Sequence, residues 1–325
     1  MTCTLPQIIL QCRILFRIVD AVVIQRGSQP RRSAVARPAL SATRGLDIVD
    51  FLAAFPTRDF TLSEIVRATG INPASCHAVL NALADRGYVA RAPGQKAFRL
   101  GPVLIAAGDA ALRAHPLVAL AREAASELAA DLDIPVMMSA AVGDDIVGII
   151  AVADSRGRMP GLRTGERRPL VPPLGAPFVA WDDEEAIAAW LAKGNDSGSE
   201  AEAVQRASLD LIRQRGFQVA LRGAGAPRLG PEIGDMARGR EAPRYRDHMV
   251  GLISGLGTIP MPEEIEPEAR YDIVLIAAPL FDRAGACAFN LCLTDFPAPL
   301  SGREVLACAE RLQAACLNVM QADRA

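Results

Sequence analysis

Residue types that build metal sites and catalytic centres are scarce in this sequence. Its 325 residues include three His and seven Cys, and only 5% of them are aromatic. The cysteines form no CxxC pair and are odd in number, so we expect neither a zinc site nor a full set of disulfides. Several of them lie within apolar patterns, which is typical of buried, reduced thiols and predicts a cytoplasmic protein. We expect no bound metal and no cofactor.

The common sequence motifs of enzymes are also absent. The sequence contains no GxSxG, no HExxH and no phosphate-binding glycine loop. The glycines of Gly223–Pro227 do not stand between a predicted strand and a predicted helix, as a dinucleotide site requires. Asp247 and His248 are adjacent in the chain, and such neighbours seldom face each other as a catalytic pair does. The sequence therefore predicts no catalytic residues, and an enzyme is the less favoured class of function.

Long hydrophobic stretches are limited to one segment near the N-terminus. Residues 5–24 read LPQIILQCRILFRIVDAVVI, and Arg13, Arg17 and Asp20 interrupt them. A single Arg at the centre of a membrane helix costs about 2.5–3.5 kcal/mol, and no small-residue cleavage site follows. We predict that residues 1–40 form a flexible or mis-started N-terminal extension and that the protein does not enter a membrane.

The net charge of -2 is unevenly distributed along the chain. Residues 1–40 hold six Arg and one Asp, and residues 41–101 hold seven Lys or Arg and five Asp or Glu, so the remainder is acidic. A basic N-terminal third on an acidic body is typical of a protein with a polyanionic partner.

Residues 41–101 have the pattern of a winged helix-turn-helix domain. Apolar residues recur at helical spacing in GLDIVDFLAAF, and a second short helix is expected to begin at Thr61 or Ser63. The third helix begins with Asn72, a favoured N-cap, followed by Pro73, whose missing N–H costs nothing there. Two short strands then form a hairpin, at 88–91 and 97–100.

The third helix is expected to turn its polar residues away from the domain core. Cys76, Val79, Leu80 and Leu83 fall at i, i+3, i+4 and i+7, which predicts that they face inward. In a helix-turn-helix the second helix of the pair can enter the major groove of DNA. The expected contacts to bases and, from the hairpin, to phosphates are made by Ser75, His77, Asn81, Arg91, Lys96 and Arg99. A winged helix can instead serve as a dimerisation module, and this alternative stays open.

The run TLSEIVRATGINPASCHAVLNALADRGYVARAPGQKAFRLGP carries a family resemblance. With the helix before it, from Arg44 to Gly101, it resembles the DNA-binding domain of the IclR family of bacterial transcription regulators. In that family a Ser/Thr-Val-His-Arg-like cluster opens the recognition helix, and Ser75, Cys76 and His77 match it. The resemblance implies that the protein binds double-stranded DNA.

The recognition helix departs from the family pattern by its low charge. Ala78 stands where a basic residue is usual, and Pro73 and Ala74 replace residues that are commonly basic or polar. This difference raises a rival hypothesis, a ligand-sensing protein that has lost sequence-specific DNA binding and acts through protein contacts. The DNA affinity of such a protein would depend on salt but not on sequence.

The rest of the chain predicts a linker helix at 102–116 and a second domain at 117–325. Apolar strands at 135–142 and 146–153 are separated by a Gly-Asp-Asp turn, and a helix closes the chain at 303–321. Hairpins with flanking helices, without strict βαβ alternation, indicate an α+β domain in which helices cover an antiparallel sheet.

The family resemblance continues into this second domain through GFQVAL, YDIVLIAAPLFDRAG and the helix after PLGAPFVAW. It implies an effector-binding domain related to GAF sensors, with an irregular insertion at about 223–270 that contains a helix near 243–257. The whole chain is then an α+β protein, with an N-terminal winged helix-turn-helix joined by a linker helix to a GAF-like effector-binding domain. In the family the linker helix joins the dimer, so a homodimer or homotetramer is expected.

The resemblance also implies a site for a small organic acid. The family binds such effectors in a cup beside the PLGAPF helix, and the free N–H groups at a helix N-terminus suit a carboxylate. Carried over by position, the effector-binding residues are Leu174, Gly175, Ala176, Leu275, Asn290, Cys292 and Thr294. Because this set offers few polar anchors, an aromatic or alkyl acid is the favoured ligand; the alternative is that these residues are plain core.

Two cysteines of the last predicted strand, Cys287 and Cys292, lie five residues apart. Side chains alternate between the two faces of a strand, so the pair is expected to point to opposite faces and cannot share a metal. Taken together, the patterns predict a ligand-responsive regulator that binds an inverted repeat in DNA.

Overall fold

The computed structural model describes residues 39–92, 94, 96–194, 199–222 and 261–324 of the chain. Of the predicted N-terminal extension at 1–40, residues 1–38 lie outside the described residues, whereas Leu40 is already the first residue of a helix. Most of the predicted insertion, including the helix expected near 243–257, lies outside them as well.

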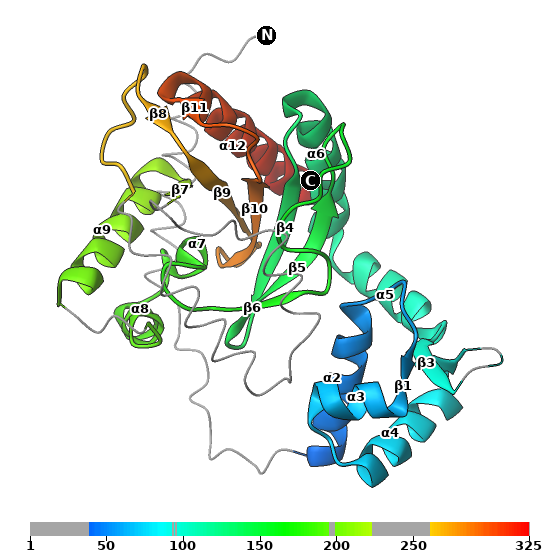
Figure 1. The fold of residues 1–325 in the computed structure, drawn as a ribbon. Helices are drawn as coiled ribbons and strands as arrows, with labels where there is room; N and C mark the ends of the chain where they lie inside the picture. Colours follow the sequence, from blue (N-terminus) through cyan, green and yellow to red (C-terminus); the bar gives the residue numbers. More distant parts are fainter. Residues whose placement is uncertain (1–38, 93, 95, 195–198, 223–260, 325) are drawn as a thin grey trace.

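The first domain is a winged helix-turn-helix (Figure 1). Its core contains Ile48, Leu52, Ile65, Cys76 and Leu80, all of them at most 2% exposed. The prediction that Cys76 and Leu80 of the third helix face the core is therefore confirmed. The elements are α2 (Leu40–Ala53), β1 (Phe60–Thr61), α3 (Leu62–Thr69), α4 (Pro73–Asp85), β2 (Val89–Arg91) and β3 (Ala97–Leu100).

The ends of the two short helices follow from local chemistry. Thr61 caps α3 in a capping box with Glu64, and the hydrogen bonds from Thr61 lower the pKa of that carboxyl group. The predicted choice between Thr61 and Ser63 is thereby settled. The side chain of Asn72 accepts a hydrogen bond of 2.9 Å from the amide of Ser75 at the start of α4. Each cap satisfies N–H groups that a helix leaves without partners.

One strand of the wing was not predicted from the sequence. The two-residue β1 pairs with β3, so that the small sheet has the order β1-β3-β2. A strand of two residues is too short to show an alternating pattern, and its pairing depends on contacts distant in sequence.

Helix α5 (Val103–Ala114) connects the first domain to α6 (Pro116–Leu132), the first helix of the second domain. No residue of α5 is buried, and Ile105 at 76% is its most exposed large apolar residue. In the described part of the chain, no single helix has the length and hydropathy needed to cross a membrane. The pair α5 and α6 meets those criteria only jointly and is bent by 93° at its break.

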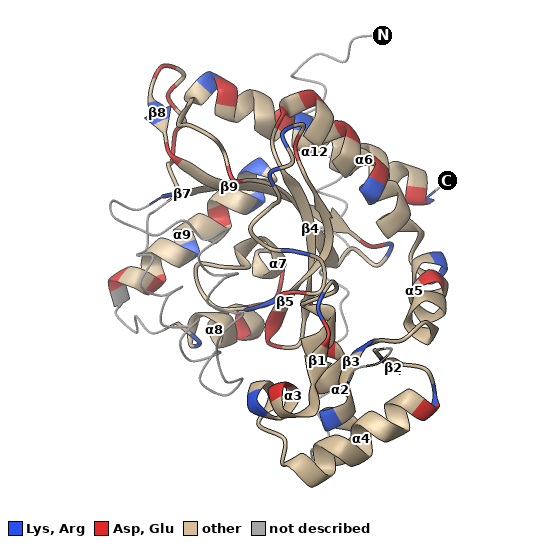
Figure 2. Cartoon of the chain, turned by 45° about the vertical axis from the view of Figure 1, so that its right-hand side comes forward, with Lys and Arg blue, Asp and Glu red and all other residues tan. Residues whose placement is uncertain are grey.

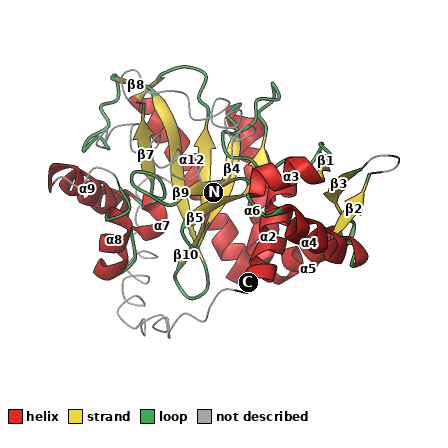
Figure 3. Cartoon of the chain, turned by 60° about the horizontal axis from the view of Figure 1, so that its bottom comes forward, coloured by secondary structure: helices red, strands yellow, loops and turns green. Residues whose placement is uncertain are grey.

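The second domain is built on a six-stranded antiparallel sheet of order β6-β5-β4-β10-β9-β7. Helices α6 and α12 (Gly302–Arg324) cover one face, and Met138, Leu291 and Leu312 are among the fully buried residues between them (Figure 3). The α+β class and the antiparallel sheet are confirmed. The strands are β4 (Val136–Val142), β5 (Asp145–Val152), β6 (Arg167–Pro169), β7 (Gln218–Leu221), β9 (Ile273–Phe281) and β10 (Cys287–Thr294).

A second, smaller core lies on the other face of the sheet. Trp181, Trp190 and Phe281 belong to it. Met261 is also buried there, so the end of the predicted insertion packs into the domain. The helices on this side are α7 (Ala176–Val179), α8 (Glu184–Leu191) and α9 (Ser199–Arg215). Elsewhere in the domain, a separate two-stranded sheet pairs β8 (Arg270–Tyr271) with β11 (Leu300–Ser301).

A bulge in β10 overturns the predicted placement of two cysteines. Cys287 pairs with Phe281 and Cys292 with Ala277, because the register shifts between Cys287 and Phe289. The two partners are four residues apart on β9, so they share a face, and Cys287 and Cys292 therefore share one too. The bulge adds one residue to β10 between Cys287 and Phe289, which places the two cysteines on the same face. The sequence pattern gives no sign of this extra residue.

The junction between wing and linker generates a stability prediction. A Cβ on Gly101 would lie 2.1 Å from the main-chain oxygen of Gly87, whereas a Cβ on Gly108 of α5 would meet nothing within 4 Å. Gly101→Ala should lower the free energy of unfolding by about 1–3 kcal/mol, because backbone must move. Gly108→Ala, the matched control, should be neutral or stabilising by up to about 1 kcal/mol. Urea unfolding followed by circular dichroism measures both, and equal midpoints would contradict the close approach.

Candidate functional site

The outward side of α4 is the candidate DNA-reading surface. His77 is exposed and Ser75 is half-buried. Between Pro73 and Asp85 the helix has no Lys or Arg, and Figure 2 shows it free of basic colour over this length. The low charge predicted for this helix is therefore a property of the folded surface.

Hydrogen bonds join the predicted contact residues to arginines of other elements. The guanidinium of Arg44 in α2 donates to the hydroxyl of Ser75 at 3.3 Å. Arg91 in β2 donates to the side-chain oxygen of Asn81 at 2.8 Å, and the amide nitrogen of Asn81 lies 3.5 Å from Nδ1 of His77. Arg44 was not identified from the sequence, because nothing in a helix pattern shows which partner helix a side chain will reach.

The remaining hairpin residues differ from one another. Lys96 is exposed at the tip side of the wing. The guanidinium of Arg99 forms an ion pair of 2.6 Å with Asp59, so its charge is already balanced within the domain. Contacts of these side chains with DNA stay predictions.

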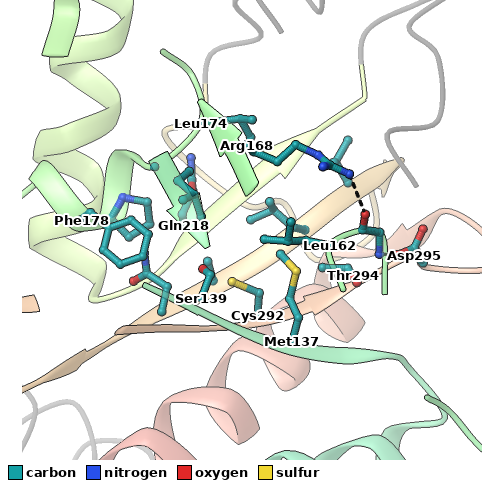
Figure 4. Close-up of a pocket in the computed structure, with 18 of the residues that line it drawn as sticks. Met137, Ser139, Leu162, Arg168, Leu174, Phe178, Gln218, Cys292, Thr294 and Asp295 are labelled. Atoms are coloured by element: carbon teal, nitrogen blue, oxygen red, sulfur yellow. Dashed lines mark hydrogen bonds between the residues drawn. The ribbon is translucent and has the colours of Figure 1, made fainter. Parts of the chain in front are cut away.

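A cavity of about 120 Å³ opens on the α7 side of the large sheet (Figure 4). Six of the seven predicted effector residues line it: Leu174, Gly175, Leu275, Asn290, Cys292 and Thr294. Met137, Leu162 and Phe178 supply much of its apolar wall. Ala176 does not line it, since this residue is only 1% exposed and belongs to the smaller core.

The predicted helix N-terminus contributes less to this cavity than expected. Helix α7 has only four residues, so its dipole is small. Gly175 precedes it with φ of 84°, and a Cβ there would lie 2.1 Å from Cδ1 of Leu170. The glycine is thus required by the turn at the cavity wall, while the positive charge comes from elsewhere.

The cavity is lined by Arg222 and, more deeply buried, by Arg168, which sequence reasoning missed. The side chain of Arg168 is 8% exposed, and it donates to the main-chain oxygens of Arg167 at 3.0 Å and Gly161 at 3.4 Å. A carboxylate oxygen of Glu166 lies 3.3 Å away. In a run of two arginines both look like surface residues, but alternation along β6 requires one of them to point inward.

The other polar residues of the lining are Ser139, Gln218, Asn290, Thr294 and Asp295. The hydroxyl oxygen of Thr294 is buried and has no hydrogen-bond partner within the described parts of the chain. The side-chain oxygen of Asn290 lies 3.6 Å from the thiol of Cys287. A buried hydroxyl without a partner costs free energy, and a bound polar ligand would recover it.

The thiols near the cavity are neutral. Burial raises the pKa of Cys292 to about 12, and burial also raises the pKa of Cys287 well above its usual value. Both groups therefore act as small, weakly polar side chains. Within the described ranges, no three His, Cys, Asp or Glu side chains gather closely enough to hold a metal ion.

Comparisons with known proteins agree with this architecture. Residues 41–93 match the family model of the IclR helix-turn-helix domain. An IclR transcriptional regulator from Alicyclobacillus acidocaldarius is similar in structure, with 19% identity and a TM-score of 0.63 over 87% of this chain and 98% of that one. HmgR of Pseudomonas aeruginosa gives 20% identity and a TM-score of 0.57 over 87% and 98%. No curated protein matches the sequence closely enough to count as a relative.

A third similar structure contains a ligand. It is an IclR homologue from Microbacterium hydrocarbonoxydans complexed with 4-hydroxybenzoate, with 15% identity and a TM-score of 0.56 over 86% of this chain and 98% of that one. At these identities the structural likeness concerns the fold.

The helix-turn-helix of the first domain is a DNA-binding domain of the kind found in transcription regulators. Residues 41–93 are thus a helix-turn-helix domain of the IclR type by sequence, and the fold of the whole chain is similar to that of IclR transcriptional regulators.

The high pKa of Cys292 generates a prediction on thiol reactivity. Because the thiolate is the reactive form, the native protein should leave Cys292 unmodified by iodoacetamide at about pH 8, where free cysteine with a pKa of about 8.5 reacts readily. Peptide mass spectrometry after a timed reaction gives the modified fraction, with free cysteine in the same tube as control. Denatured protein should react fully, and native reaction at the rate of free cysteine would contradict the buried, neutral state.

Proposed function

We propose that this regulator is ligand-responsive, binding an inverted repeat as a dimer or tetramer under the control of a small organic acid in the cavity. The favoured ligand has an aromatic or alkyl body and one carboxylate. The proposal rests on a single structural relation, in which one segment of the chain contacts both the cavity and the DNA-binding domain.

That segment is 161–168, here named the bridging segment. Leu162 and Arg168 line the cavity. Arg167, the neighbour of Arg168 on β6, forms an ion pair of 2.9 Å with Asp50 of α2. Burial and the charge of Asp50 raise the pKa of Asp47, while Arg167 lowers it, so Arg167 acts on both carboxyl groups of α2. A shift of the segment upon ligand binding would therefore alter its contact with the DNA-binding domain.

The lining of the cavity supports the proposed ligand class. Mostly apolar walls with a few convergent polar groups are typical of a small-molecule site. Here the polar groups include Arg168, Asn290 and Thr294, which suit a carboxylate and a hydroxyl or second oxygen. The similar structure that holds 4-hydroxybenzoate supports an aromatic acid of this size as a first candidate.

The exposed apolar residues of α5 support the proposed oligomer. Val103, Ile105 and Leu112 are exposed by 36–76% on a helix that has no buried residue within the described chain. Contact with a second copy would remove this apolar surface from water. Two copies would also present two reading helices, as an inverted repeat requires.

Selection of genomic fragments by the purified protein, at one fixed near-physiological salt concentration, tests the DNA part of the proposal. An enriched inverted repeat would support it. Binding without any enriched sequence would support the rival ligand sensor, which the absence of Lys and Arg from α4 favours.

The ligand part generates a prediction on affinity. Thermal unfolding and calorimetric titration should detect binding of 4-hydroxybenzoate, benzoate or hexanoate, and much weaker binding of benzamide, which lacks the charge. Arg168→Gln should weaken binding of the acids by about 10- to 100-fold, because a hydrogen bond to a charged group contributes about 1.5–3 kcal/mol. Arg283→Gln, an exposed arginine paired with Asp323, is the matched control and should change nothing. Equal affinities for acid and amide in the unmodified protein would contradict the acid class.

The bridging segment generates a prediction on coupling. Asp50→Asn should leave ligand affinity nearly unchanged and reduce the effect of the ligand on the dissociation constant for an enriched fragment, because it removes the ion pair with Arg167. Fluorescence anisotropy with and without the best acid measures this effect. Asp109→Asn, which breaks an exposed pair with Arg113 on α5, is the control. An unchanged ligand effect in Asp50→Asn would contradict a route through this contact.

A further inference from the structure

The middle of the reading surface on α4 is formed by small apolar side chains. Ala74, Ala78 and Ala82 are exposed, while Cys76 and Leu80 on the opposite side are fully buried. The middle of this exposed surface therefore has no charged side chain that could bind the phosphate backbone of DNA. Affinity for DNA must come from the surroundings of the helix.

One edge of this surface is occupied by an arginine from α2. Helices α2 and α4 pack closely where Gly45 meets Val79, since a Cβ on Gly45 would lie 3.8 Å from Cγ1 of Val79. This packing places Arg44 beside the first turn of α4, where it donates to Ser75. Both side chains are half-buried, so the guanidinium lies at the surface and not in the core.

The other edge is occupied by an arginine from the wing. Arg91 donates to Asn81, whose amide nitrogen lies beside His77, and its guanidinium stacks 5.2 Å from the ring centre of Phe98. Successive residues of a helix are rotated by about 100°, so Ser75 and His77 lie about 200° apart on opposite edges of the exposed surface. The two arginines thus stand on either side of α4.

The partners of these arginines distinguish them from others in the domain. Arg58 and Arg99 are ion-paired with Glu64 and Asp59. Within the described residues, Arg44 and Arg91 form hydrogen bonds only to neutral side chains and no ion pair. Their positive charges are held in place without being neutralised, which suits contact with phosphate.

We propose that Arg44 is a DNA-binding residue and that Arg44 and Arg91 contact phosphates on the two sides of the groove that α4 enters. Together they supply the positive charge that α4 lacks. Ser75 positions Arg44 in this arrangement and is not a base-reading residue, while His77 stays the exposed polar group nearest the bases.

The salt dependence of binding tests this assignment on the full chain. Anisotropy of a labelled duplex at about 50–200 mM NaCl gives the slope of log K against log salt, which each lost phosphate contact reduces by about 0.9 per bound subunit. Arg44→Gln and Arg91→Gln should each show this loss and weaken binding to an enriched fragment and to random duplex alike. Arg44→Lys and Ser75→Ala, which keep a positive charge at the site, should keep the slope. Arg283→Gln, at an exposed arginine of the second domain that is paired with Asp323, is the matched charge control.

The outcomes separate a phosphate contact from a structural role. A merely structural Arg44 would lower the unfolding temperature and affinity without changing the slope. An Arg44→Gln slope equal to that of Arg283→Gln overturns the proposal, as does loss of slope in Arg44→Lys. Absence of any duplex binding by the unmodified protein overturns it together with the DNA-binding function, so the two failures are distinguishable.

Discussion

The close passage of the bridging segment across β5 is the constraint on which both domains depend. A Cβ on Gly148 would lie 2.2 Å from the main-chain oxygen of Arg163, so this crossing is open to glycine alone without a backbone shift. The backbone of Gly148 also donates to Glu166 at 2.9 Å and accepts from Gly165 at 2.8 Å. The segment is therefore fixed to the sheet by main-chain contacts, and its side chains are left to line the cavity and to meet α2.

The two arginines of β6 serve these two contacts with different energetics. Arg168 is nearly buried, and three hydrogen-bond acceptors offset the cost of removing its charge from water. The pair of Arg167 with Asp50 is almost half exposed, and such pairs contribute only about 0–1 kcal/mol. A contact this weak can be altered by a ligand of modest differential affinity, and it can supply at most the lower end of the usual coupling energy of about 1–3 kcal/mol between linked sites.

The DNA-binding domain divides its chemistry in a similar way. Helix α4 exposes alanines and few polar side chains. The basic side chains beside it are Arg44 of α2 and Arg91 of the wing. Helix α4 thus supplies the shape that fits a groove, while α2 and the wing supply the positive charge. In the proposed arrangement, affinity for DNA in general and preference between sequences depend on different residues, because phosphate contacts position a protein while base contacts specify the site.

The sequence by itself determined the elements and their order. Helical spacing, the Asn72-Pro73 start and glycines at turns placed the longer helices and strands, because these signals act within a few residues. The short strands β1, β6, β8 and β11 were not placed. The family resemblance also indicated seven effector residues, and six of them line one cavity. The tertiary structure alone decided the inward turn of Arg168, the shared face of Cys287 and Cys292, and the reach of Arg44 to α4. Each of these depends on register or packing between segments far apart in the chain, which no local pattern records.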